Sequence, residues 1–88
     1  MREPYPLPRI AERDFVTLRK LMKGEPDFPE TYADWLALWK RRSMEEQQRG
    51  QEIQWVDFGP SDLEQFCEST GLPPSWGALT KLVGGMVR

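Results

Sequence analysis

Apolar side chains recur at helical spacing in four stretches of the chain. The pattern predicts helices over residues 10–23, 29–49, 61–70 and 74–86. A glycine follows the first three stretches, at positions 24, 50 and 71, where it can end a helix. Ser61 and Glu64 have the spacing of a capping box, which predicts that the third helix begins at Ser61.

The second of these helices divides into two unlike halves. Its first half carries a stripe of large apolar side chains, namely Tyr32, Trp35, Leu36 and Trp39. Residues 40–49 read KRRSMEEQQR and contain one apolar residue, Met44. We expect this second half to be a solvated face. The basic run Lys40-Arg41-Arg42 belongs to that face, because Glu45 and Glu46 follow it at once.

Residues 52–58 (EIQWVDF) have the character of a strand. They are rich in β-branched and aromatic residues, and Gly50 and the pair Gly59-Pro60 bound them. Ile53 and Trp55 would share one face, and Val56 and Phe58 the other. Both faces therefore need to be covered.

Prolines at positions 4, 6 and 8 prevent a helix at the start of the chain and predict an extended arm over residues 1–9. In an extended chain, successive backbone groups point to opposite sides. The missing N–H groups would then all lie on one side, and those of Tyr5, Leu7 and Arg9 on the other. An edge strand tolerates this arrangement. A polyproline-like arm without a partner is the simpler alternative.

A single strand cannot satisfy its own backbone, so residues 52–58 need a partner. The proline arm could supply it, as could the same strand of a second molecule about a two-fold axis, or another protein by strand addition. We favour the symmetric dimer. Its candidate interface residues are Ile53, Trp55, Val56 and Phe58 of the strand, with Trp35 and Trp39 of the preceding helix. Packing in the core is the simpler alternative for each tryptophan.

The chain has 88 residues, enough for one domain at most, and we expect a single helical domain over 10–88 behind the arm. The fold class is mainly α, with the order α-α-β-α-α, and becomes α+β if the strand pairs. A net charge of −2 argues against nucleic acid as the main partner. The sequence has neither a membrane span nor a secretory signal, and its one cysteine suits the cytoplasm.

No constellation of residues points to catalysis, a metal or a cofactor. The chain lacks histidine, and Cys67 lies on an apolar stripe without a base, as expected of a buried structural thiol. The acidic residues Glu25, Asp27 and Glu30 lack the spacing of a calcium loop. Asp57 ends the strand without a partner base, and Gly59-Pro60-Ser61 lacks a phosphate-loop pattern.

The sequence therefore predicts a non-enzymatic protein that acts through protein–protein contact, as a homodimer or with another protein partner. The alternative is a small DNA-associated regulator that uses a helix-turn-helix-like pair at residues 61–87. Gly71 sits where that motif favours glycine, but Thr70, Gly77 and Thr80 occupy positions that it usually fills with apolar residues. The would-be recognition helix also carries few side chains that could contact base edges.

Overall fold

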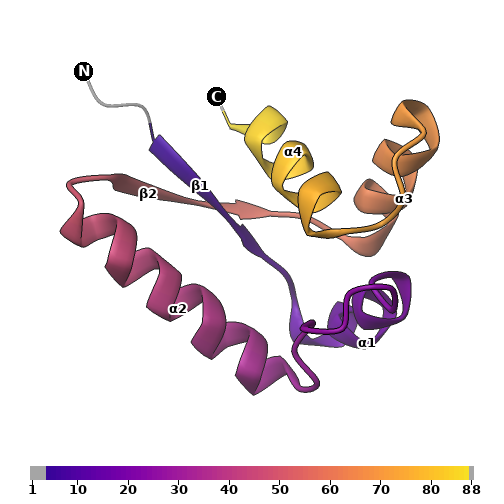
Figure 1. Cartoon of the computed structure of the whole chain (residues 1–88), viewed down its shortest axis with the longest axis horizontal. Coiled ribbons are helices and arrows are strands. Elements are labelled where there is room, and N and C mark those ends of the chain that lie inside the picture. Colours follow the sequence, from indigo (N-terminus) through magenta and orange to yellow (C-terminus); the bar gives the residue numbers. More distant parts are fainter. Residues whose placement is uncertain (1–3, 88) are drawn as a thin grey trace.

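The computed structural model of the chain describes residues 4–87. Residues 1–3 of the predicted arm, and residue 88, lie outside this range. The elements are β1 (Pro4–Arg9), α1 (Glu12–Leu21), α2 (Tyr32–Gln48), β2 (Glu52–Asp57), α3 (Pro60–Thr70) and α4 (Trp76–Met86) (Figure 1). The predicted class, mainly α and α+β if the strand pairs, agrees with this architecture.

The partner of the predicted strand is the proline arm. β1 and β2 form a two-stranded parallel sheet, in which Pro4 pairs with Glu52 and Arg9 pairs with Asp57. The helices α1 and α2 make the connection between the strands, as parallel strands require. Of the alternatives that the sequence left open, pairing within the chain is present, and β1 is not a partnerless polyproline arm.

The alternation of prolines explains how β1 can join a sheet. The carbonyl oxygen of Arg9 accepts a hydrogen bond from the N–H of Phe58, at 3.1 Å, so the backbone of Arg9 faces β2. The backbone groups of Leu7 and Tyr5, two and four positions earlier, point to β2 in the same way. The three prolines then face the outer side of β1, where their missing N–H groups cost no bond to β2.

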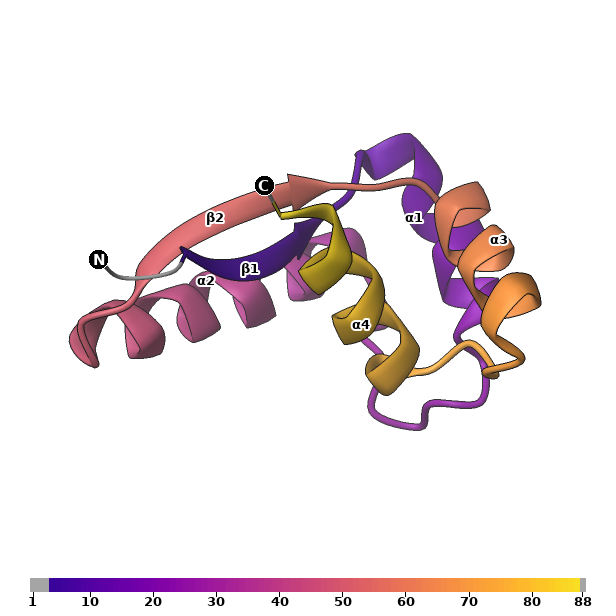
Figure 2. The ribbon, with the colours of Figure 1, turned by 90° about the horizontal axis from the view of Figure 1, so that it is seen from above.

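Two of the helices pack against the strands, and the other two pack mainly against other helices. The helix α2 contacts both strands, and α4 lies along β1 (Figures 1 and 2). At the other end of the molecule α1 packs against α3, and α3 against α4. One core cluster joins these elements, with Leu18, Met22, Trp35, Leu63 and Leu79 as its largest fully buried side chains. None of the helices within residues 4–87 is long and apolar enough to cross a membrane.

All four helices begin one to three residues from the predicted position; α1 begins at Glu12 rather than near Ile10, and α4 at Trp76 rather than near residue 74. The helix α2 begins at Tyr32 rather than near Pro29, because the Thr31 side chain accepts a hydrogen bond from the Asp34 N–H at 3.1 Å. The helix α3 begins at Pro60 rather than Ser61. There Asp62, not Ser61, makes the cap: its carboxylate accepts a hydrogen bond from the Gly59 N–H at 2.8 Å.

The left-handed backbone of Gly71 (φ 75°) ends α3, as predicted. The prediction of a wholly solvated second half of α2 was wrong at two positions. Ser43 and Glu46 are only 9% and 4% exposed, because this part of α2 packs toward the strands. Glu46 accepts a hydrogen bond from Arg49 at 2.9 Å, which offsets part of the cost of burying its charge.

Candidate functional site

A cluster of aromatic rings fixes the position of α2 against α4 and the connector between α1 and α2. Trp35, 1% exposed, lies at its centre and contacts the rings of Trp39 and Trp76, whose centroids lie 5.6 and 6.4 Å from its own. The Trp76 indole Nε1 donates a hydrogen bond to Asp27 at 2.8 Å, which ties the connector to α4. Two surface features form around this cluster, one on each side of α2.

The six residues predicted for an interface separate into two groups. Trp35, Val56 and Phe58 are 1%, 6% and 7% exposed and belong to the core of the chain. Ile53 and Trp39 are partly buried, whereas Trp55 is 38% exposed. Of the four strand residues, Ile53 and Trp55 are therefore the two with side chains that a partner could reach.

The first surface feature is the outer edge of β2. Because Phe58 directs its N–H to β1, the backbone N–H and C=O groups of Gln54 and Val56 also point to β1. The backbone groups of Ile53, Trp55 and Asp57 consequently point away from β1. They find no hydrogen-bond partner within residues 4–87, and Figure 2 shows no ribbon beyond β2 along this edge.

Exposed apolar side chains accompany this edge. Trp55 and Leu36, the latter 49% exposed, both line a groove of about 280 Å³ between β2 and α2. At the end of the strand the Arg9 guanidinium donates two hydrogen bonds to the Asp57 carboxylate, at 2.7 and 3.0 Å. This pair lowers the pKa of Asp57 and raises that of Arg9. The edge thus combines free backbone groups with an apolar border.

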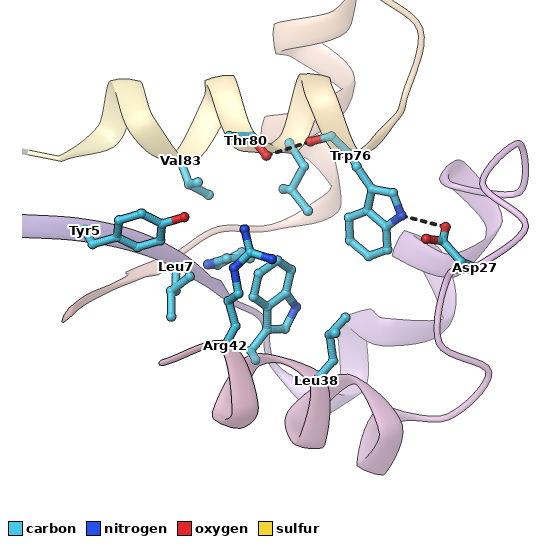
Figure 3. A pocket seen from close by; sticks show the side chains of 11 residues that line it. Tyr5, Leu7, Asp27, Leu38, Arg42, Trp76, Thr80 and Val83 are labelled. Atoms are coloured by element: carbon cyan, nitrogen blue, oxygen red, sulfur yellow. Dashed lines mark hydrogen bonds between the residues drawn. The ribbon is translucent and has the colours of Figure 1, made fainter. Parts of the chain in front are cut away.

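The second surface feature is an open pocket of about 300 Å³ on the other side of α2 (Figure 3). Its walls come from β1, α2, α4 and the connector, and most of them are apolar or aromatic: Leu7, Leu38, Trp39, Trp76, Leu79 and Val83. Tyr5 and Arg42 lie at one end, with the Tyr5 hydroxyl directed toward the Arg42 guanidinium, and Asp27 lies at the other. Interaction with Tyr5 raises the pKa of Arg42.

Trp39 lies between the two features and lines both. Its indole Nε1 is buried and meets no hydrogen-bond acceptor within residues 4–87. Its ring is steeply inclined to those of Trp35 and Trp76, at 66° and 71°. Such edge-to-face packing is favourable for aromatic rings, although it does not replace the hydrogen bond that the buried indole N–H lacks.

Of the remaining candidates, Cys67 lines neither feature, whereas the basic run of α2 borders both. Cys67 is 8% exposed, and burial raises the pKa of its thiol, which disfavours the reactive thiolate. Within residues 4–87 no three His, Cys, Asp or Glu side chains come together as a possible metal site. The helix α4 turns Ala78, Leu79 and Val83 inward and carries one basic residue, Lys81. Lys40 borders the groove and Arg42 the pocket, so the basic run is divided between them.

Sequence reasoning did not find the pocket. Tyr5 and Arg42 lie far apart in the sequence, and only the pairing of β1 with β2 brings the arm against α2. The comparisons add no family to this description: protein-family models, curated proteins and solved structures were each compared with the chain, and none matches.

Proposed function

We propose that the chain is a small non-enzymatic protein that acts through protein–protein contact and forms a homodimer across the outer edge of β2. The observation that carries the proposal is the row of unpartnered backbone groups at Ile53, Trp55 and Asp57, beside the exposed side chains of Trp55 and Leu36. A two-stranded parallel pair is a small sheet, and a second copy would extend it to four strands.

The positions of the free groups restrict how two copies can pair. In an antiparallel pair, two residues that exchange hydrogen bonds lie directly opposite each other. A residue whose backbone groups point away from β1 must therefore lie opposite a residue of the other copy whose backbone groups do the same. A two-fold axis at Gln54 meets this condition and places Ile53 of each copy opposite Trp55 of the other. An aromatic side chain across from a β-branched one is a favourable cross-strand pair. The same rule keeps Glu52 of one copy from lying directly opposite Asp57 of the other.

The chain's size also favours association. A domain of 88 residues buries a modest fraction of its surface, and oligomerisation is a common way for small domains to gain stability. The single cysteine is buried, which suits the reducing cytoplasm in which we propose that the protein works. The dimer surface would then be the first place to search for a further protein partner.

The molar mass in solution tests the proposal. Light scattering after size-exclusion chromatography should give twice the chain mass of 10.3 kDa, at low and at high salt, because the proposed contact is apolar and backbone-mediated. The variant Trp55→Lys should elute as a folded monomer, since a lysine on an edge strand opposes pairing.

The matched control is Val16→Lys. Val16 is 59% exposed on α1, far from the edge in sequence, and the change adds the same charge to an exposed apolar site. This variant should remain a dimer. A wild-type chain that stays at 10.3 kDa at high concentration would overturn the proposal, as would equal dissociation of both variants.

A further inference from the structure

We propose that the pocket between β1, α2 and α4 binds a small organic monocarboxylate with an aromatic body, its carboxylate held by Arg42 and Tyr5. The cavity of about 300 Å³ lies at the lower end of the range for small-molecule sites, which suits a single ring with a short side chain. This inference does not depend on dimer formation.

The charges in the pocket indicate where the carboxylate of the ligand would bind. Arg42 forms no ion pair within 4 Å among the described residues, where the two ion pairs found are Arg9–Asp57 and Arg49–Glu46. The Tyr5 hydroxyl points toward its guanidinium (Figure 3). A planar guanidinium binds a carboxylate through two parallel hydrogen bonds, and a tyrosine hydroxyl can donate a third.

The aromatic body follows from the walls. Beyond Arg42 the pocket continues along Trp39 and Trp76, which pack edge to face with ring centroids 6.0 Å apart, and along the aliphatic side chains of Leu38 and Leu79. A ring in this space would replace water against aromatic and aliphatic surface and could pack at an angle to either indole.

The far end of the pocket limits the charge of the ligand. Asp27 lies there, with its Oδ1 held by the Trp76 indole at 2.8 Å. A second carboxylate on the ligand would approach this acid and be repelled. The pocket should therefore prefer a monocarboxylate over a dicarboxylate of the same length.

Nuclear magnetic resonance gives a direct test, because the four tryptophans provide four indole N–H signals. The probe is 3-phenylpropionate, compared with its uncharged amide and with phenethylammonium, which carries a positive charge on a similar body. Millimolar 3-phenylpropionate should move the indole signals of Trp39 and Trp76 saturably and leave that of Trp55 in place. The amide should bind at least about ten-fold more weakly than the acid, because it cannot form the charge-assisted hydrogen bonds.

The variant Arg42→Gln should remove the advantage of the acid over the amide. The control Arg41→Gln loses the same charge at the neighbouring position, where the side chain is exposed and does not line the pocket, and should keep that advantage. Equal binding of acid, amide and ammonium to the wild-type chain would overturn the proposal, as would shifts confined to Trp55. The comparison of the three probes tests the proposal even if Arg42→Gln fails to fold.

Discussion

The two edges of the sheet are built in opposite ways. The outer side of β1 carries three prolines and lacks N–H groups at each of those positions, and α4 lies along the same strand. The outer side of β2 keeps the N–H and C=O groups of Ile53, Trp55 and Asp57, with an exposed tryptophan beside them. Proline and a covering helix are two ways in which proteins protect sheet edges against unwanted pairing.

The difference identifies the direction in which the sheet can grow. A strand added to β1 would find acceptors without the matching donors, whereas a strand added to β2 would find both. If the chain pairs with another strand, β2 is therefore the edge that can receive it. Substitutions in the two strands test this difference.

The largest effect should come from placing a proline on the inner side of β1. Leu7 is 2% exposed, and its N–H faces β2. The change Leu7→Pro removes a buried side chain and a bond between the strands, and should lower the free energy of unfolding by about 3 kcal/mol or more. Chemical denaturation followed by tryptophan fluorescence measures it. A variant as stable as the wild type would contradict the direction assigned to the backbone of β1.

A matched pair of substitutions in β2 separates its two sides. Gln54→Pro removes an N–H that faces β1 and should cost about 1–3 kcal/mol in the isolated chain, because a carbonyl of β1 loses its donor. Ile53→Pro removes an N–H that faces outward. We expect it to cost about 1 kcal/mol or less in the isolated chain, from lost side-chain burial, but to abolish the dimer.

Denaturation at low protein concentration measures the stability of the isolated chain. The molar mass at high concentration shows whether the dimer forms. The assignment of the two sides fails if Ile53→Pro destabilises the isolated chain more than Gln54→Pro does.

The smallest effect should come from the ion pair at the end of the sheet. Arg9 lowers the pKa of Asp57, so the pair stabilises the fold above the ordinary carboxyl pKa, and this contribution disappears as the pH falls through the folded-state value. Both side chains are largely exposed, so Arg9→Gln should change the stability little. The carboxyl resonance of Asp57, titrated with pH, should show a higher pKa in Arg9→Gln than in the wild type. An unchanged pKa would mean that Arg9 does not hold this carboxylate in solution.

Lys40→Gln is the control for the ion pair, since Lys40 borders the same groove and its loss removes one positive charge without touching Asp57. The titration of Asp57 in this variant should follow that of the wild type.

The sheet shows what a local pattern can and cannot predict. The alternation of prolines 4, 6 and 8 was enough to predict that β1 could serve as an edge strand, because the geometry of an extended chain fixes which side each N–H faces. The choice of partner was not predictable in the same way. It depends on α2 and α4 packing against the sheet, and these contacts join residues that lie far apart in the sequence.

The starts of the helices and the pocket were missed, each for its own physical reason. Ser61 and Asp62 offer competing caps, and the fit of Pro60 in the first turn of α3 decides between them. Arg42 looked like part of a solvated face because its sequence neighbours are charged. Only the folded chain places it beside Tyr5 at the end of an aromatic pocket.

Hydrogen exchange at neighbouring amides of β2 tests the central claim most directly. At high protein concentration the amides of Ile53 and Trp55 should be protected along with those of Gln54 and Val56, because a second copy covers the outer edge. On dilution to the monomer, the first two should lose protection while the other two keep it. Fast exchange of Ile53 and Trp55 at every concentration, with Gln54 and Val56 protected throughout, would contradict the dimer and leave β2 as an open edge.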